Sequence, residues 1–405
     1  MRHCGRPNSV GSVADKMNTQ IGSATFDGKR DSNVLREPEI NKSTERKILT
    51  VLVLVALTIT TASAQYQRTD LVSNQPGIAP VTDPNLVNAW GLVALATSPW
   101  WVSDNGTGDS SLFNAMGQPV IASGGSTNFV TVPPAPSSPA GTLGTPTGIV
   151  GNISTNSNDF TITEDGRSGR SIFIFATLDG TISGWNPAVG IVNPATGATH
   201  ATLAANRSNV GAVYTGLAIA TNQQGQTFLY AADGGPNRRV DMFDGTFGLV
   251  KSFDDPAIPR GFTTYGIQTI NGNIWVTFTA LNKAQGGFVD VFDTEGNLVK
   301  HFAARGPLHS PWGIALAPAD FGPMSNAILI SNNISRGRIN AFNPETGQFL
   351  GPLRDANGKV IEVDNIWALQ FGHDGGPNGA HNQLFFTAGP DSYANGLFGV
   401  ITVGP

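Results

Sequence analysis

The hydrophobic residues of this chain fall into short runs that end at glycine, aspartate or asparagine. Runs of six β-branched and aromatic residues, such as 171–176 and 273–278, are typical of strands. Outside the N-terminal segment, apolar residues do not keep the three-and-four-residue spacing of an amphipathic helix for more than a few turns. The pattern therefore predicts an all-β protein.

A longer repeat organises these strands. Six times a small residue, usually a glycine with an aromatic residue close before it, leads into an apolar stretch. The six small residues are Gly91, Gly148, Gly216, Gly266, Gly313 and Ala368. They recur every 47 to 68 residues, and units of this length with several short strands are typical of β-propellers. We therefore predict a six-bladed β-propeller that occupies residues 65–405 as a single domain.

The repeat has a physical explanation. Inner strands crowd around the centre of a propeller, so a residue without a Cβ is expected where they begin. The neighbouring Trp or Tyr supplies a large apolar surface that packs one blade against the next. Asp or Asn at the end of the second strand is expected to bind the backbone of its own turn.

The two ends of the domain predict how the ring closes. The last unit offers three strand patterns, whereas residues 66–73 form a strand pattern with no blade of their own. We predict that 66–73 pairs with 397–403 as the outer strand of the last blade, which would cover an open edge. Two stretches, 133–146 and 186–199, are expected to be insertions, either long loops or lids.

Two resemblances agree with this architecture. Residues 230–244 contain a strand that ends in Ala-Asp, followed by Arg-Val-Asp-Met-Phe-Asp, and this order resembles the NHL repeat of six-bladed propellers. Residues 66–74, 82–91 and 101–108 resemble an uncharacterised family of secreted bacterial six-bladed propellers. The second resemblance implies a propeller fold and export, and it brings no catalytic residues.

Residues 1–64 are predicted to be a leader. An apolar core at 48–61 follows Arg46 and Lys47, and Ala62-Ser63-Ala64 provides a small-x-small site, so we expect a Sec signal peptide cleaved after Ala64. A membrane anchor is the alternative, although the core is short for a span of about 20 residues. We expect an exported protein, periplasmic or extracellular, without stable membrane insertion after cleavage. The single cysteine, Cys4, lies in the leader.

The charge of the remaining chain limits its partners. It keeps 15 of the 24 basic residues and 23 of the 29 acidic residues, which gives a net charge of −8. No basic run with interleaved aromatic residues occurs in it. Nucleic acid is therefore not an expected partner, and anionic membrane surfaces are disfavoured for the same reason.

Candidate chemistry comes from topology, because no nucleophile elbow, phosphate loop or zinc-protease motif occurs. In a propeller, the loops from second to third strands and from blade to blade emerge on one face. The polar residues expected at this channel mouth are Asn88, Asp104, Asn105, Asp179, Tyr214, Asp233, His309, Asn332, Asp364 and Asp391. Asp104 and Asp233 are candidate ligands for Ca²⁺, which prefers oxygen donors. The alternative is that each acid only caps its turn.

Histidines provide two further candidates. His309 is expected near the channel mouth, where it could titrate. His373, Asp374 and His381 could hold a transition metal, but they fall in a Gly/Pro-rich loop on the opposite face, where ordinary turn chemistry explains them.

Three classes of function are compatible with the sequence. The first is an exported binding or scaffold module for a small molecule, a glycan or a protein. The second is a hydrolase or lyase in which a divalent metal assists cleavage of an ester, lactone or glycan at the channel mouth. The third is a structural component of an exported matrix. The missing catalytic signature favours the first, and whether the protein is an enzyme stays open.

Overall fold

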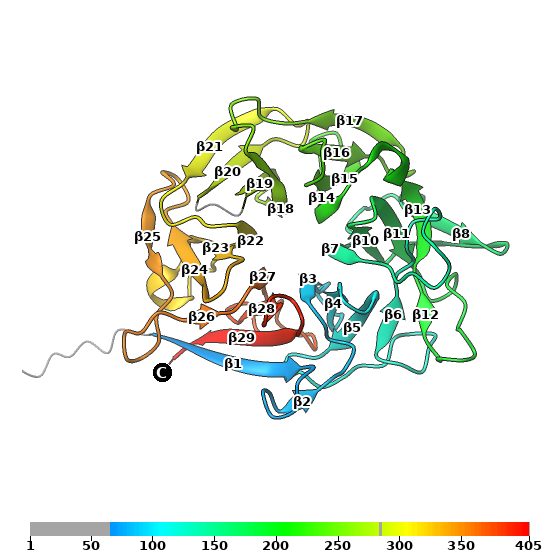
Figure 1. The fold of residues 1–405 in the computed structure, drawn as a ribbon, viewed down its shortest axis with the longest axis horizontal. Helices are drawn as coiled ribbons and strands as arrows, with labels where there is room; N and C mark the ends of the chain where they lie inside the picture. The colour runs from blue at the N-terminus through cyan, green and yellow to red at the C-terminus, as the bar shows by residue number, and fades with distance from the viewer. Residues whose placement is uncertain (1–64, 283–285, 405) are drawn as a thin grey trace, which may run out of the picture. The chain divides into compact units, whose positions relative to one another are not determined.

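The computed structural model describes residues 65–282 and 286–404. In this part of the chain, six sheets of four or five strands are arranged around a common centre (Figure 1). The helical content of the described residues is limited to two short 3-10 turns, Ser208–Val210 and Gly322–Met324. The prediction of an all-β, six-bladed β-propeller is confirmed.

Each blade is a sheet whose main strands are antiparallel, and its first strand lies at the centre and its last at the outside. Blade 1 consists of β3 (Ala89–Val93), β4 (Trp100–Asp104), β5 (Asp109–Phe113) and β6 (Phe129–Thr131). Blade 2 consists of β7 (Pro146–Gly151), β10 (Phe173–Thr177), β11 (Thr181–Trp185) and β13 (Thr202–Asn206). Blade 3 consists of β14 (Tyr214–Thr221), β15 (Thr227–Asp233), β16 (Arg239–Phe243) and β17 (Leu249–Phe253).

Blades 4 and 5 follow the same order, and blade 6 takes its outer strand from the start of the domain. Blade 4 consists of β18 (Phe262–Ile270), β19 (Asn273–Ala280), β20 (Gly287–Phe292) and β21 (Leu298–Ala304). Blade 5 consists of β22 (Pro311–Leu316), β23 (Ile328–Asn332), β24 (Gly337–Phe342) and β25 (Phe349–Pro352). Blade 6 consists of β27 (Ile366–Phe371), β28 (Leu384–Ala388), β29 (Leu397–Val403) and β1 (Tyr66–Ser73). Blade 5 also carries β26 (Glu362–Val363), which pairs with β24.

The ring closes as predicted. Strand β1 pairs antiparallel with β29 from Tyr66–Val403 to Ser73–Leu397 and forms the outer part of blade 6. The short β2 (Val81–Thr82) then covers the free edge of β1. The Tyr66 hydroxyl donates to the Phe321 carbonyl at 2.8 Å and accepts from the Met324 N–H at 2.8 Å, so β1 is also fastened to blade 5.

The repeat glycines lie where neighbouring blades approach each other most closely. A Cβ on Gly266 would lie 2.0 Å from the Trp312 carbonyl oxygen of blade 5, and one on Gly91 would lie 2.1 Å from the Thr147 carbonyl oxygen of blade 2. Because the obstacle is backbone, a side chain there would force the blades apart. The sequence expectation of crowding at these positions is confirmed.

Apolar side chains fill the spaces between blades. Six clusters of buried apolar residues occur in the described chain, and each lies mainly between two neighbouring blades, with Trp312 of blade 5 joining the cluster between blades 6 and 1. The cluster between blades 1 and 2, for example, stacks Trp101 on Phe173 at a ring distance of 4.3 Å. The ring of blades is therefore held by six equivalent hydrophobic layers.

The two insertions differ. Residues 132–145 contain no strand, whereas the stretch 186–199 leads into β12 (Thr199–His200), which pairs in parallel with β6 of blade 1. A hairpin that the sequence did not reveal, β8 (Thr161–Glu164) and β9 (Arg167–Arg170), lies beside it, and Glu164 accepts from the His200 imidazole at 2.8 Å. The second insertion thus extends the outer edge of blade 1.

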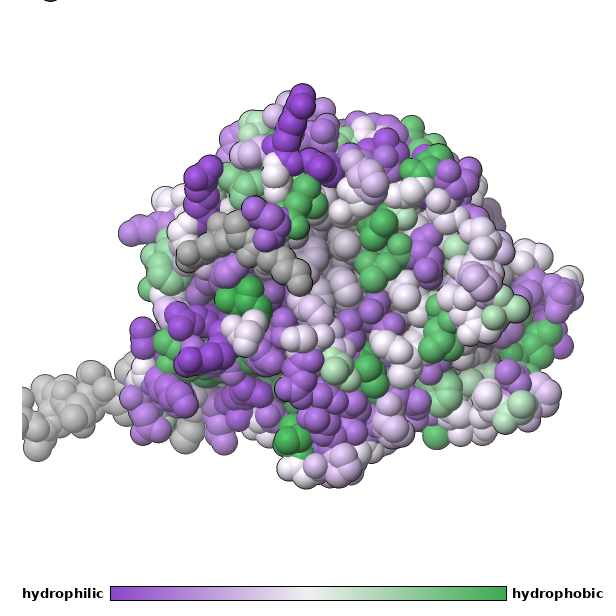
Figure 2. All heavy atoms as spheres, viewed as in Figure 1, coloured by the Kyte–Doolittle hydropathy of each residue, from purple (hydrophilic) through white to green (hydrophobic). Residues whose placement is uncertain are grey.

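The leader prediction concerns residues outside the described part of the chain. No helix within residues 65–282 or 286–404 is both long enough and apolar enough to span a bilayer. On the side seen in Figure 2, hydrophobic residues are scattered among hydrophilic ones and do not gather into one large patch.

Candidate functional site

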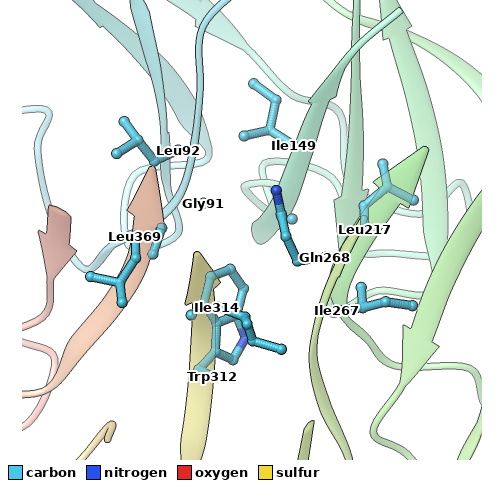
Figure 3. A pocket seen from close by; sticks show the side chains of 12 residues that line it. Gly91, Leu92, Ile149, Leu217, Ile267, Gln268, Trp312, Ile314 and Leu369 are labelled. Carbon is cyan, nitrogen blue, oxygen red and sulfur yellow. The ribbon is translucent and has the colours of Figure 1, made fainter. Parts of the chain in front are cut away.

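The centre of the propeller is narrow and apolar. One side chain from the inner strand of each blade lines it: Leu92, Ile149, Leu217, Ile267, Ile314 and Leu369 (Figure 3). The space between them is a cavity of about 20 Å³, and Gln268 is the polar side chain in its lining. A channel of this kind can hold little more than a water molecule.

Tryptophans close the mouth end of this channel. Trp90 and Trp367 stack with ring centres 3.7 Å apart, and Trp312 meets both rings edge-on. The Trp367 indole N–H donates to the Asn88 side-chain oxygen at 3.0 Å, and the Trp312 N–H donates to the Thr215 carbonyl at 3.0 Å. These three aromatic residues of the repeat therefore form a fixed plug.

An open cavity of about 440 Å³ lies on the mouth side of blades 3 to 6. Its lining is composed of hydroxyl, amide, aromatic and small apolar residues and the one histidine His309. The lining residues are Thr215, Gly234, Thr263, Thr264, Tyr265, Thr279, Ala280, Leu281, His309, Ser310, Asn333, Ile334, Ser335, Asn365, Ser392 and Tyr393. We call this the mouth cavity. Its volume is in the range of small-molecule sites.

Two tyrosines and one amide organise the mouth cavity. The hydroxyls of Tyr393 and Tyr265 both donate to the side-chain oxygen of Asn333, at 2.8 and 3.1 Å, while the Asn333 amide nitrogen donates to the Ile366 carbonyl. Burial raises the pKa of both tyrosines, so both hydroxyls stay neutral at physiological pH. Both rings also lie near Trp367, at 5.7 and 5.5 Å.

The backbone at this cavity is strained. Asp391, Ser392 and Tyr393 are three consecutive non-glycine residues with φ of 54°, 56° and 72°, and Ser310 and Asn365 are left-handed as well. Left-handed L-residues cost roughly 1–2 kcal/mol each. Such strain persists only where surrounding contacts enforce it, and it concentrates at binding sites.

His309 lies at the rim of the mouth cavity. Its backbone N–H donates to the Asn332 side-chain oxygen at 3.1 Å, and the Asn332 amide donates to the Pro307 carbonyl at 2.7 Å. Within the described residues its imidazole makes no hydrogen bond or ion pair. The ring is thus available to a ligand.

Asp104 and Asp233, the predicted calcium ligands, end the second strands of blades 1 and 3 and are fully buried. Asp233 accepts from the backbone N–H groups of Val213 and Gly235 and from the Asn237 amide, at 2.8 to 3.0 Å. This is the predicted turn cap. Asp104 has no such cap, since it accepts from the Ser111 hydroxyl at 2.6 Å and its other oxygen has no partner in the described chain. Calcium at these residues stays a prediction.

Asp104 belongs to a buried acidic group in blade 1. Burial raises its pKa well above the usual range, and the nearby carboxylates of Asp109 and Asp83 raise it further. Burial also raises the pKa of Asp109, to about 6. At least one proton is therefore held in this group at mildly acidic pH.

The other predicted residues are divided between small local clusters. The Asn88 amide donates to the Asn105 side chain at 3.1 Å, and Asp364 accepts from the Asp391 backbone N–H at 3.1 Å. Tyr214 is buried and donates to Asp241 at 2.9 Å. Asp179 lies in the turn after β10, and one of its oxygens is buried without a partner in the described chain. Of the predicted set, only His309 lines the mouth cavity itself.

A neighbouring cavity of about 480 Å³ shares His309 but has a charged lining. Arg336 and Arg338 both bind Glu362, at 2.8 and 3.1 Å, and Arg354 also belongs to the lining, so this cavity keeps a net positive charge. The two cavities therefore differ in chemistry although they share a rim.

Sequence reasoning missed the tyrosine–amide core of the mouth cavity. Tyr265 was assigned to blade packing, and Asn333 follows the predicted Asn332 directly. Tyr393 lies in a loop without a motif. The usable signal was the pair of adjacent asparagines at the end of β23, because one caps the loop and the second remains for another partner.

Comparisons with known proteins leave the activity open. No family model matches this chain. It is 27% identical to uncharacterised protein L690 of Acanthamoeba polyphaga mimivirus over 356 residues, which cover 84% of this chain and 86% of the viral protein. Protein R648 of the same virus is also 27% identical, over 82% of this chain and 78% of the relative. These relatives are viral, whereas the sequence resemblance was to a bacterial family; membership of that family and the NHL-like repeats stay predictions.

Solved structures with similar folds are propellers of distant sequence. The BBS1 N-terminal domain in complex with ARL6 is 12% identical, with a TM-score of 0.43 over 80% of this chain and 81% of that one. The WD40 propeller of Doa1 is 11% identical, with a TM-score of 0.42 over 82% and 96% of the two chains. At this similarity neither supports a functional assignment.

Proposed function

We propose that this protein is an exported binding propeller whose mouth cavity holds a neutral, hydroxyl-rich ligand, of the kind presented by a terminal sugar of a glycan. The observation that carries the proposal is the lining of the cavity. No Asp, Glu, Lys or Arg belongs to it among the described residues, whereas hydroxyl, amide and tyrosine side chains surround about 440 Å³.

The chemistry of this lining matches such a ligand. Threonine and serine hydroxyls and asparagine amides can both donate and accept, as sugar hydroxyls do. Tyrosine adds a rigid ring with a polar tip. Because the Asn333 amide is already held by the two tyrosines and by blade 6, ligand binding has few side chains left to order.

Binding is favoured over metal-assisted cleavage at this cavity. A general acid or base in a glycoside or ester reaction is usually a carboxylate or histidine. His309 is the one such group in the described lining, and no carboxylate accompanies it there.

The proposed export depends on the predicted leader, and N-terminal sequencing of secreted material would test it. The mature protein should begin at Gln65, and residues upstream of Ile48 in that material would refute the prediction.

The test is a titration of the chain beginning at Gln65 with neutral sugars and with their charged counterparts, a uronate and an amino sugar. We expect saturable quenching or enhancement of tryptophan fluorescence by a neutral sugar, because Trp367 adjoins both cavity tyrosines. Tyr393→Ala should weaken this binding at least tenfold, and Thr163→Val, on the distant β8 hairpin, should leave it unchanged. Equal binding by Tyr393→Ala and the parent would contradict the site.

A further inference from the structure

A second cluster lies away from the mouth cavity, on the outer half of blade 4. It contains Asp255, from the loop between β17 and β18, Asp290 of β20 and His301 of β21. One ligand atom from each side chain lies within 4.8 Å of the others. In residues 65–282 and 286–404, no other three His, Cys, Asp or Glu side chains come together in this way. The His301 Nδ1 lies 3.1 Å from an Asp290 oxygen and 3.4 Å from an Asp255 oxygen.

The two buried carboxylates of this cluster have few donors. The side chains of Asp255 and Asp290 are 3% and 2% exposed. Oδ2 of Asp290 has no hydrogen-bond partner in the described chain, and Oδ2 of Asp255 makes no hydrogen bond there but lies 3.4 Å from the His301 Nδ1. The other Asp255 oxygen accepts from the Ala257 N–H at 2.9 Å, which fixes the carboxylate in place. Burying two acceptors without donors is costly unless a cation or proton compensates them.

Blades 3 and 5 show how a polar side chain at this position can be satisfied. Strand pairing places Asp241 of blade 3 and Asn340 of blade 5 at the position of Asp290. Asp241 accepts from Arg239, Ser252 and Tyr214, all within 2.9 Å. The Asn340 amide donates to the Pro307 carbonyl at 2.8 Å. In blade 4 the corresponding partners are a second carboxylate and a histidine, so a single imidazole nitrogen faces two buried carboxylates.

We propose that Asp255, Asp290 and His301 bind a divalent first-row metal ion such as Zn²⁺. Two carboxylate oxygens and one imidazole nitrogen are a suitable donor set for this ion. Because His301 is 59% exposed, a fourth coordination position would face solvent and could take water or a ligand group. The ion would neutralise the charge of the two buried carboxylates.

The competing explanation is a proton shared by the two carboxylates. The pKa of Asp290 is raised to about 6, chiefly by burial and also by the adjacent Asp255, while the His301 hydrogen bond opposes the shift. A shared proton would stabilise the same geometry at acidic pH without any metal. The two explanations differ in their response to added zinc.

The test is equilibrium dialysis and thermal unfolding of chelator-treated protein with Zn²⁺ alone, followed by Co²⁺ as a spectroscopic substitute. We expect one Zn²⁺ per chain, a rise in Tm that grows with zinc concentration, and Co²⁺ absorption bands of a nitrogen- and oxygen-ligated ion. His301→Ala and Asp290→Asn should each abolish the Tm shift.

His381→Ala provides the matched control. His381 binds Asp374 and Asp320 at 2.7 and 3.1 Å, but on the exposed surface, so it represents adventitious zinc binding. The variant should keep the full zinc response. His301 is on an outer strand with an exposed side chain, so His301→Ala carries the test if an aspartate variant fails to fold. Absence of zinc binding by the parent, or loss of the response in His381→Ala instead of His301→Ala, would overturn the proposal.

Discussion

The mouth cavity of blades 3 to 6 and the strand ends that carry Asp104 and Asp233 represent two different uses of polar residues. Around the mouth cavity, neutral side chains surround open space. At the ends of β4 and β15, the acids are fully buried, and Asp233 accepts from two groups of its own turn and from the Val213 N–H before β14. Asp233 thus serves the blade in which it occurs, whereas the open site is lined by strand ends and loops of four blades.

This difference follows from the propeller repeat. A residue that recurs in every blade meets a requirement of every blade, such as a cap or a close approach to the next blade. Residues needed for a single site have no such reason to recur, and of the three that organise the mouth cavity only Tyr265, next to the repeat glycine Gly266, belongs to the repeat. The following predictions, from the largest expected effect to the smallest, test this separation.

Removal of the closing strand should have the largest effect and should disturb both regions. A chain beginning at Asn74 lacks β1, so β29 of blade 6 loses its antiparallel partner and exposes an edge. We expect aggregation or a large fall in Tm relative to the chain beginning at Gln65. An unchanged Tm would show that closure by β1 is not needed.

Asp233→Ala should be strongly destabilising. It leaves the half-buried N–H groups of Val213 and Gly235 and the Asn237 amide without their acceptor, at a total cost of about 3 kcal/mol. Denaturant unfolding should show the same loss with calcium and with chelator. A calcium-dependent stabilisation of the parent that disappears in this variant would instead establish the predicted calcium site.

Asp109→Asn should stabilise the protein at neutral pH, whereas Asp233→Ala destabilises it. The folded-state pKa of Asp109 is about 6, above the ordinary value, so its contribution to stability is full below about pH 4 and declines as the pH rises to about 6. Asparagine removes this penalty. We expect a gain of about 1–2 kcal/mol at pH 7–8, after allowance for solvent screening, and no gain at pH 4.

Asp244→Asn is the control for that pH dependence. Burial alone would raise the pKa of Asp244, but the hydrogen bonds from the Thr246 hydroxyl and from the Gly248 and Thr246 N–H groups together outweigh it and lower the pKa. Its stabilisation is therefore present at neutral pH and is lost as the pH falls. Asp244→Asn should lower the free energy of unfolding at pH 7 and lower it less at pH 3. If Asp244→Asn and Asp109→Asn changed stability with pH in the same way, the raised pKa of Asp109 would be refuted.

Tyr393→Phe should change stability least and still affect the mouth cavity. It removes one hydroxyl donor to Asn333, worth about 1 kcal/mol, while Tyr265 keeps the other. Thermal unfolding should therefore shift slightly, and sugar binding should weaken because the Asn333 amide is less well fixed. A large loss of stability would mean that the tyrosine pair has a structural role above all.

Much of the fold was predictable from the sequence because its determinants are local and periodic. Gly91, Gly266 and Gly313 each mark an inner strand, and a strand pattern without a blade at 66–73 was enough to predict closure. The site was less predictable. Tyr393 and Asn333 are 60 positions apart. Nothing in the repeat predicts that the hydroxyls of Tyr393 and Tyr265 both donate to Asn333.

The sequence also could not separate equivalent acids. Asp241 and Asp290 occupy the same position in their blades, and both precede a Phe-Asp pair by one residue. Their difference depends on what pairs with them across the sheet, Ser252 in one blade and His301 in the other, and on Asp255 from the preceding loop. Such differences appear only once the strands are in register.

The most direct test of the central claim is calorimetric titration of the chain beginning at Gln65 with a neutral oligosaccharide selected in the sugar panel, in parallel with Tyr393→Ala and Asp233→Asn. The account predicts saturable one-site binding by the parent, loss of at least tenfold in affinity for Tyr393→Ala, and unchanged affinity for folded Asp233→Asn. Binding that is lost in Asp233→Asn and retained in Tyr393→Ala would contradict the claim that the neutral mouth cavity, and not the periodic acids, is the binding site.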